Sequence, residues 1–295
     1  MTDHLITLRD HLRYSVTRFE AAGLTYGHGS DNAWDEAAYL LCHALHLPLE
    51  RLDAFLDARL LPEERAVLLD RIERRASERL PAPYLTGEAW LSGHRFRVDR
   101  NVIVPRSFIA ELLDEGLNPW IADPMAVGKV LDLCTGSGCL AILAALAFPE
   151  ASIDAIDISP GALAVAHANR GDYKLESRLR LIESDLFTSL GAERYDLIIS
   201  NPPYVDADAM AALPDEYRHE PSLALAGGSD GLDLVHRIFA GARARLNPGG
   251  LLVVEIGHNR AVLEAAYPDT GFVWLETEAG DEYVFLLHRD EIPLR

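Results

Sequence analysis

The sequence predicts an α/β protein in which a smaller helical domain precedes a doubly wound, seven-stranded sheet. In residues 1–80, apolar side chains recur at three- and four-residue spacing, as they do in amphipathic helices. From Lys129 onward, short apolar runs alternate with helical patterns, which is typical of parallel strands joined by crossover helices. A chain of 295 residues is long enough to bury a core in each part.

The first domain is expected to span residues 1–85 and to be helical. Gly23 is placed to end the first helix, Asp31 to cap the second, and Pro62 to begin the last. The predicted helices are one with apolar positions from Leu5 to Phe19, one after Asp31, a short one at 52–56 and one from Pro62 to Leu80.

Residues 86–105 are expected to form a β-hairpin linker. The pattern has period two from Glu88 to Val104, with turn signals at Ser92-Gly93 and Asp99-Arg100. Pro105-Arg106-Ser107 then begins a helix, and residues 106–295 form the second domain. Arg106 is a candidate to face an active site, with an ordinary surface arginine as the alternative.

Seven strands are predicted in the second domain, with helices after most of the first five. The last two strands form a hairpin that closes the sheet, and right-handed crossovers place helices on both faces. The expected strands are 129–134, 152–157, 179–184, 195–200, 250–256, 271–276 and 281–287.

Charge is distributed unevenly along the chain, whose net charge is −19. Residues 1–105 hold 16 acids and 13 bases, whereas residues 106–295 hold 30 acids and 14 bases. An acidic surface repels the phosphate backbone of nucleic acids and favours a basic partner. Ordinary solubility is the alternative explanation.

No targeting or metal-binding pattern is evident. No apolar run approaches the roughly 18 residues of a membrane span, and no secretory signal is seen, so a soluble cytoplasmic protein without membrane partners is expected. The three cysteines show no CxxC spacing with companion histidines, so neither a zinc site nor a disulfide framework is expected.

Asn201-Pro202-Pro203-Tyr204 follows the apolar run 195–200, so it is predicted at the carboxyl end of a buried strand, where open α/β sheets bind ligands. Two prolines stiffen the loop and remove two backbone donors. The Asn side chain and the carbonyls can then accept from a planar NH2 group, either an amide or a base amine. The alternative is that Pro-Pro only ends the strand. Gly257 is expected to be an ordinary turn glycine.

A glycine-rich turn, Thr135 to Gly138, follows the first predicted strand of the sheet. Gly136 and Gly138 allow the backbone to approach a ligand closely. Asp157 lies 19 residues after Gly138, at the end of the next strand, where an acid can accept from both ribose hydroxyls. The spacing also fits a dinucleotide fingerprint, so it predicts an adenosine-type cofactor without choosing which one.

Two further acids favour S-adenosylmethionine. Asp132 lies inside the first strand, where a carboxylate suits a cationic cofactor better than a pyrophosphate. Asp185 follows the third strand and is expected to accept from the adenine amine, while Leu186 or Phe187 packs on the ring. An N-cap or Asx-turn is the alternative for Asp185.

Together these motifs resemble the class I S-adenosylmethionine-dependent methyltransferases, and the 201–204 loop is similar to that of the amino-methyltransferases among them. Over nearly all 295 residues the chain resembles the protein-glutamine N5-methyltransferases. It is closer to the branch acting on large-subunit ribosomal protein three than to the branch acting on peptide release factors. Release-factor enzymes typically read Pro-Arg-Pro-Asp-Thr-Glu at the linker, whereas residues 105–110 here read PRSFIA. The segments that carry this assignment are 26–29 (YGHG), 34–36 (WDE), 104–107 (VPRS) and 214–221 (PDEYRHEP).

The resemblance implies a Rossmann-like sheet and a direct SN2 transfer of methyl to a glutamine amide nitrogen. Asn201 and the Pro202 carbonyl would accept the two amide hydrogens, and Tyr204 would stack on or wall in the glutamine; these three are the catalytic candidates. The proton can leave to solvent, so no obligatory general base is expected. The expected cofactor-binding residues are Asp132, Cys134, Thr135, Gly136, Ser137, Gly138, Asp157, Asp185, Leu186 and Asn201. The expected substrate-binding residues are Asn201, Pro202, Pro203, Tyr204, Arg106, His219 and Glu220.

The expected partner is basic large-subunit ribosomal protein three, free or within a ribosome assembly intermediate. For His219 and Glu220, contact with the substrate or closure of a flap and a rigid crossover are equally open. The alternatives for the whole chain are methylation of release factors, methylation of a nucleic-acid amine, a nicotinamide oxidoreductase and a non-catalytic assembly factor. The acidic second half argues against a specific DNA partner.

Overall fold

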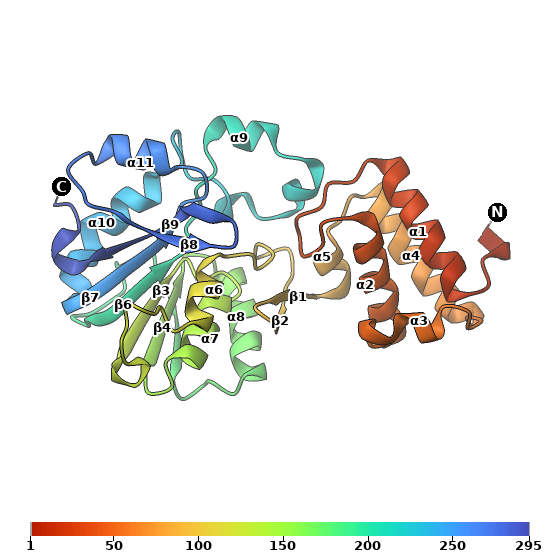
Figure 1. Ribbon diagram of the computed structural model, residues 1–295, viewed down its shortest axis with the longest axis horizontal. Helices are drawn as coiled ribbons and strands as arrows, with labels where there is room; N and C mark the ends of the chain where they lie inside the picture. Colours follow the sequence, from red (N-terminus) through yellow and green to blue (C-terminus); the bar gives the residue numbers. More distant parts are fainter. Residues whose placement is uncertain (1, 295) are drawn as a thin grey trace. The chain divides into compact units, whose positions relative to one another are not determined.

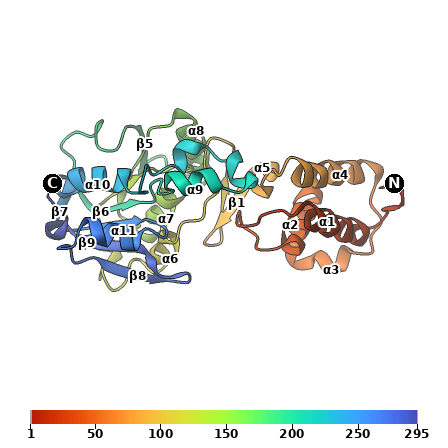
Figure 2. The same ribbon diagram turned by 90° about the horizontal axis from the view of Figure 1, so that it is seen from above.

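The computed structural model describes residues 2–294, which divide into two compact units (Figures 1 and 2). The helical unit comprises the chain up to Ala89 together with Val98–Arg100 and Pro214–His219. The sheet unit comprises Trp90–Arg97, Asn101–Leu213 and the chain from Glu220 onward. Within residues 2–294, no helix combines the length and the apolar character needed to cross a membrane.

Three long helices build the core of the helical unit. Their buried faces meet around side chains such as Phe19, Leu41 and Ile72, each exposed by 1% or less. The long helices are α1 (Leu8–Ala22), α2 (Ala33–Leu45) and α4 (Pro62–Ser77). The shorter elements are η1 (Thr2–His4), η2 (Leu49–Arg51), α3 (Leu52–Phe55) and α5 (Ala82–Thr86).

The caps of these helices agree with the sequence at two ends and differ at a third. Gly23 ends α1 in the left-handed conformation, and Pro62 begins α4, both as predicted. The expected cap Asp31 is wrong, because Asn32 caps α2: its side-chain oxygen accepts from the backbone N–H of Asp35 at 2.9 Å. The capping residue must reach an N–H two or three positions on, and Asp31 stands one residue too early.

The predicted hairpin is present as β1 (Glu88–Leu91) and β2 (His94–Arg97). Ser92 and Gly93 between them both have positive φ, 49° and 71°. Two such residues in succession make the turn whose twist matches a pair of antiparallel strands.

The sheet unit contains the predicted seven strands, in the order β5-β4-β3-β6-β7-β9-β8 (Figure 1). The first five in sequence run parallel to one another, and β9 runs antiparallel to both β7 and β8. This confirms a doubly wound sheet closed by a hairpin. The strands are β3 (Lys129–Leu133), β4 (Ser152–Asp157), β5 (Leu179–Glu183), β6 (Tyr195–Ser200), β7 (Leu246–Glu255), β8 (Val273–Thr277) and β9 (Gly280–His288).

The largest difference from prediction is the start of β7, which begins at Leu246 and not at residue 250. Leu246 pairs with Tyr195, and the register then shifts before Leu251 pairs with Leu197. Gly249, whose φ is +78°, therefore lies at an irregularity inside the strand and not before its beginning.

Helices cover both faces of the sheet. Successive strand residues point to opposite faces, so Val130 packs in the core with α6 and α7, while Leu131 packs in the core with α10 and α11. The strand order reverses between β3 and β6, which places a ligand-binding crevice outside their carboxyl ends. The helices are α6 (Ile109–Asp114), α7 (Cys139–Ala147), α8 (Pro160–Asp172), α9 (Ala207–Ala212), α10 (Asp233–Arg245) and α11 (Arg260–Ala266).

Candidate active site

A cavity of about 190 Å³ lies at the carboxyl ends of the central strands, within the sheet unit. Residues that follow four neighbouring parallel strands line it together: Gly136 after β3, Asp157 ending β4, Asp185 after β5 and Asn201 after β6. Cys134, Leu186 and Pro203 also lie in its wall. Segments that the sequence assigned to a cofactor and to an NH2 group therefore share one cavity.

The two glycines of the β3 turn have different surroundings. A Cβ on Gly136, whose φ is +55°, would meet no protein atom within 4 Å, so this backbone is open to a ligand. A Cβ on Gly138, whose φ is +80°, would lie 3.2 Å from the Cβ of Ala166 in α8. Gly138 is therefore needed for close helix packing, whereas Gly136 leaves space on the cavity side.

Asp157 is held at the cavity wall by the backbone. One carboxylate oxygen accepts from the N–H of Gly136 at 2.8 Å, and the other accepts from the N–H of Ser159 at 2.9 Å. Burial raises the pKa of Asp157, and these donated hydrogens oppose the rise. A carboxylate offers about four acceptor sites, so two remain for a ligand.

Asp132 and Thr135 lie deeper than the cavity. Asp132 is fully buried, accepts a short hydrogen bond from the Thr135 hydroxyl and does not line the cavity. Burial raises its pKa to about 7. The backbone oxygen of Ser137 accepts from Asn169 at 2.8 Å. In this structure Asp132 fixes the glycine turn; its expected proximity to a cationic cofactor stays a prediction.

Asp185 has a partner that the sequence did not reveal. Its carboxylate accepts from Nη2 of Arg237 on α10 at 2.7 Å, and both residues line the cavity. The salt bridge orients the carboxylate while leaving acceptor sites on it. Leu186 beside it adopts a φ of +48° and is buried in the cavity wall.

Asn201 presents an uncommitted amide to the cavity. Among residues 2–294, no hydrogen-bond partner is found for its side chain, and none for the carbonyl of Pro202. A stiff Pro-Pro segment holds these groups at the end of β6. Asn201 is thus available to a ligand in the cavity, whereas Pro202 is buried and does not line it, so the assignment of its carbonyl to an NH2 group stays a prediction.

Tyr204 is fixed within the sheet unit and does not line the cavity. Its carbonyl accepts from Nδ2 of Asn259 at 2.8 Å, and its hydroxyl donates to Glu255 at 3.4 Å. A Cβ on Gly257 would lie 2.6 Å from the Tyr204 ring. Gly257 is a turn glycine with φ +55°, as expected, but it is also a required close contact of this tyrosine.

Glu255 joins Tyr204 to the linker before α6. The fully buried carboxylate accepts from the Ser107 hydroxyl at 2.6 Å and from the backbone N–H of Phe108 at 2.9 Å. Burial raises its pKa to about 7. Sequence reasoning missed Glu255, although an acid that ends an apolar strand at the ligand-binding edge is a usable signal.

Arg106 and Glu220 bind each other. Nη2 of Arg106 donates to Oε2 of Glu220 at 2.6 Å, while Oε1 accepts from the N–H of Val104 at 2.9 Å. His219 belongs to the helical unit, where its Nε2 lies 2.8 Å from the carbonyl of Glu78. These contacts favour the rigid-crossover interpretation, and contact of the three side chains with a substrate stays a prediction.

Comparisons with known proteins show the family of this chain. The model of the methyltransferase small domain matches residues 108–214, and that of the PrmC N-terminal domain matches residues 12–87. Two relatives named ribosomal protein uL3 glutamine methyltransferase are 61% identical (Bordetella pertussis) and 60% identical (Burkholderia pseudomallei). The first alignment covers 98% of this chain and 97% of the relative, and the second covers 97% and 96%. A third relative of that name, from Neisseria meningitidis, is 58% identical over 98% of this chain and 95% of its own.

Among solved structures, the hMettl16 catalytic domain in complex with MAT2A 3′UTR hairpin 1 is similar in fold. The TM-score is 0.56 at 14% identity, over 88% of this chain and 93% of that one. Full-length identity near 60% confirms the family that the sequence motifs predicted. The chain belongs to the ribosomal protein uL3 glutamine methyltransferase family.

Proposed function

We propose that this protein transfers a methyl group from S-adenosylmethionine to the side-chain amide nitrogen of a glutamine in ribosomal protein uL3. The observation that carries the proposal is the uncommitted side chain of Asn201 in the cavity that Gly136 and Asp157 also line, with the unpaired carbonyl of Pro202 next to it in the chain. A glutamine amide has two hydrogens in one plane, which two such acceptors can hold.

The residues of the cavity fit the methyl donor. Gly136 leaves open space for close approach, and Asp157 keeps two acceptor sites for the ribose hydroxyls. Asp185 and Leu186 suit the adenine amine and ring, respectively. When bound, S-adenosylmethionine supplies an electrophilic methyl group on a sulfonium.

Asn201 and Pro202 would act on the glutamine. An amide nitrogen is a poor nucleophile, because its lone pair is delocalised into the carbonyl. Two acceptors orient the NH2 group and favour pyramidalisation as positive charge builds on nitrogen, an interaction stronger in the transition state than in the ground state. Direct transfer then needs no general base, since the charged nitrogen product can lose its proton to solvent.

Tyr204 would limit where the glutamine can lie. Asn259 and Glu255 hold its two polar ends, and Gly257 leaves room for its ring. A residue whose backbone and ring are both held in place can serve as a rigid wall, because little conformational entropy is lost when the substrate binds. The helical unit is proposed to recognise the protein substrate.

The test is an incubation of the protein with a radiolabelled methyl donor and, separately, uL3, a peptide release factor or DNA. We expect label on uL3, located by mass spectrometry on a glutamine side chain. Label on the release factor alone would assign the protein to the other glutamine branch. Label on DNA alone, or on none of the three, would overturn the proposal.

A further inference from the structure

The segment Pro214–His219, called the anchor segment below, belongs to the helical unit although the residues on both sides of it belong to the sheet unit. It follows the Asn-Pro-Pro-Tyr loop in the chain. Sequence patterns placed it in the second domain, as a crossover between two strands. Its contacts show what holds it in the other unit.

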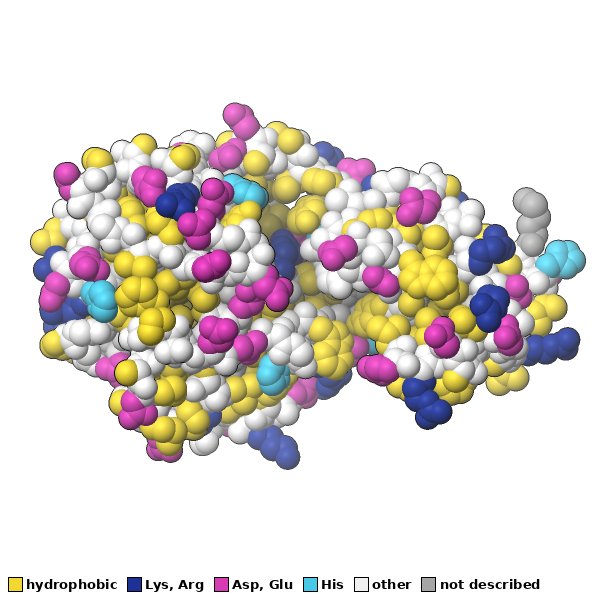
Figure 3. Space-filling model, viewed as in Figure 1, with side chains coloured by type: hydrophobic (Ala, Val, Ile, Leu, Met, Phe, Trp, Pro, Cys, Tyr) yellow, Lys and Arg dark blue, Asp and Glu magenta, His cyan; other side chains and the backbone are white. Residues whose placement is uncertain are grey.

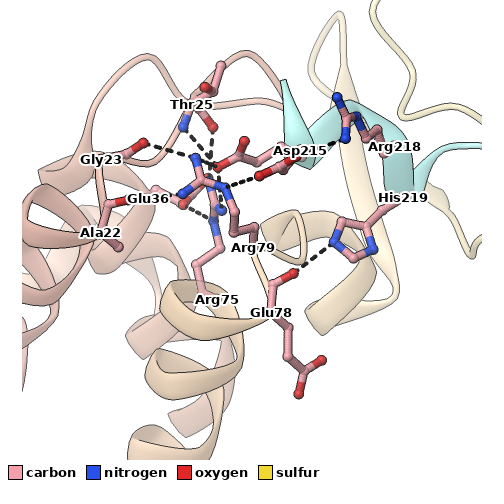
Figure 4. A network of polar contacts seen from close by, with 11 residues as sticks. Ala22, Gly23, Thr25, Glu36, Arg75, Glu78, Arg79, Asp215, Arg218 and His219 are labelled. Carbon is pink, nitrogen blue, oxygen red and sulfur yellow. Dashed lines mark hydrogen bonds and ion pairs between the residues drawn. The ribbon is translucent and has the colours of Figure 1, made fainter. Parts of the chain in front are cut away.

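Glu216 is the centre of these contacts and is fully buried. Its Oε1 accepts from the backbone N–H of Thr25 at 2.9 Å and from Nη2 of Arg79 at 2.9 Å, and lies 3.5 Å from Nη1 of Arg75. Figure 4 shows both arginines extending from α4 and the residues just after it toward Thr25 and the anchor segment. Burial alone would raise the pKa of Glu216, but the Thr25 N–H and the two guanidinium groups hold it below its ordinary value.

The same arginine also organises the helical unit. Arg75 is fully buried, donates from Nε to Glu36 of α2 at 2.6 Å and from Nη2 to the carbonyl of Thr25 at 3.1 Å. Arg75 therefore keeps a charged partner when Glu216 is removed. This makes Glu216 a position where the anchor segment can be released without leaving Arg75 unpaired.

Two neighbours of Glu216 strengthen the attachment. The ring of Tyr217 lies 4.5 Å from that of His28, and a Cβ on Gly27 would lie 2.6 Å from the Tyr217 hydroxyl. His219 contacts the carbonyl of Glu78 (Figure 4). Three residues of the anchor segment, Glu216, Tyr217 and His219, thus contact the rest of the helical unit, and Glu216 does so through buried charged groups.

The chain on each side is fixed in the sheet unit. Val205, next to Tyr204, exchanges backbone hydrogen bonds with Leu225 and Gly227 at 2.9 and 2.8 Å. Only residues 206–213 separate it from the anchor segment. On the other side, Glu220 follows His219 directly and is held by Arg106. Because both connections are short, a displacement of the anchor segment is transmitted to Val205, next to the Asn-Pro-Pro-Tyr loop, and to Glu220.

We propose that Glu216 is a positioning residue that couples the helical unit to the Asn-Pro-Pro-Tyr loop. Through the anchor segment, engagement of the protein substrate by the helical unit sets the position of the loop that holds the glutamine. This inference rests on the function proposed above. A role confined to the stability of the helical unit is the competing explanation.

The test compares Glu216→Gln with the wild-type protein and with Glu73→Gln. Glu73 accepts from Arg18 and Tyr14 within the helical unit, so Glu73→Gln is a control for the loss of an ion pair, here between partly exposed side chains. Rates are expressed per molecule that binds S-adenosylmethionine, which removes any misfolded fraction from the comparison. Hydrogen exchange of residues 205–221 reports release of the anchor segment.

We expect Glu216→Gln to accelerate exchange in this segment and to lower kcat on uL3 about tenfold to a hundredfold, as for a misplaced reacting group. KM for uL3 and the affinity for S-adenosylmethionine should stay within about threefold, because neither binding surface is removed. Glu73→Gln should leave kcat unchanged. Arg79→Met should reproduce the effect, and the double variant should add little to it.

An unchanged kcat in Glu216→Gln despite faster exchange would overturn the coupling while leaving the proposed function intact. If Glu73→Gln loses as much kcat as Glu216→Gln, the coupling is also overturned, because the loss then reflects the stability of the helical unit in general. If Glu216→Gln does not fold, Glu216→Asp provides the same comparison with a shortened carboxylate. Failure of the wild-type protein to methylate uL3 would instead remove the proposed function itself.

Discussion

Asn201 and Asp157 line the same cavity but are assigned to different ligands. Asn201 has no partner among the described residues and is assigned to the amide that is methylated, whereas Asp157 is braced by two backbone N–H groups and is assigned to the cofactor. Substitution of each should therefore affect a different measured quantity.

We predict that Asn201→Ala abolishes methylation of uL3 while the affinity for S-adenosylmethionine changes by less than about tenfold, or about 1.4 kcal/mol. Asp157→Ala should instead weaken cofactor binding, because the ribose loses its acceptors. Calorimetric titration of the methyl donor and a methylation assay separate the two effects. Normal turnover in Asn201→Ala would remove that residue from the amide site.

Glu255 predicts a dependence of stability on pH. Its pKa is raised from 4.5 to about 7 in the folded protein, chiefly by burial. Between these values the folded state binds more protons than the unfolded state, so the free energy of unfolding falls as pH rises. The full effect is present below about pH 4.5 and lost above about pH 7, and it amounts to about 3 kcal/mol at most.

In the variant Glu255→Gln, this pH-dependent part of the free energy of unfolding should be absent, because an amide does not titrate. The amide oxygen can still accept from Ser107 and Phe108, so the local contacts are kept. Urea unfolding at about pH 5 and about pH 8 should show that the wild-type protein loses more stability over this interval than the variant does. Equal losses in both proteins would show that Glu255 has an ordinary pKa.

At the scale of elements, regular structure was predictable and the partners of buried polar groups were not. Strands and helices follow from local periodicity, and the placement of Asn201 and Asp157 at one edge follows from the rule for open parallel sheets. Glu255 and Ser107 are 148 residues apart in sequence, and Asp185 and Arg237 are 52 apart. No local pattern encodes such pairs, because they depend on how distant strands and helices pack.

The distant contacts of a loop glycine likewise cannot be predicted from its local sequence. Gly257 shows this, and its contact with Tyr204 can be tested. Its turn geometry was predictable, but its contact with Tyr204 comes from a loop 53 residues away in the sequence. Gly249 offers a control, because it also has a positive φ while a Cβ there would meet no atom within 4 Å. Alanine at either position carries the same backbone strain, about 1–2 kcal/mol.

We predict that Gly257→Ala lowers kcat on uL3 by about tenfold or more, since its Cβ must displace the Tyr204 ring from the position in which its hydroxyl donates to Glu255. Gly249→Ala should lose only the stability that backbone strain costs and should keep its kcat. Thermal unfolding and steady-state kinetics on both variants measure the two effects. Similar kcat values in the two variants would show that the position of the Tyr204 ring does not matter for transfer.

At the scale of the whole molecule, the division into units was less predictable than either core. The helical and α/β regions follow from composition and periodicity, whereas the anchor segment is read from sequence as part of the second domain. Its place in the helical unit depends on Arg75 and Arg79, which lie more than 130 residues before Glu216. A buried ion pair at that separation leaves no periodic signal.

Net charge also acts at this scale. Acidic side chains are spread over the face shown in Figure 3, in keeping with the excess of 30 acids over 14 bases in residues 106–295. A field of one sign accelerates encounter with an oppositely charged protein and is screened by salt over a Debye length of about 10 Å at 0.1 M. A basic ribosomal protein should therefore associate faster at low ionic strength.

We predict that kcat/KM for uL3 falls about tenfold or more between about 50 and about 300 mM salt, mainly through KM. The affinity for S-adenosylmethionine should change much less, because contacts inside a cavity are screened weakly. Steady-state kinetics across this range, with parallel calorimetry of the methyl donor, measure both. A kcat/KM that does not depend on salt would mean that the acidic surface serves solubility alone, and recognition of uL3 would then rest on short-range contacts.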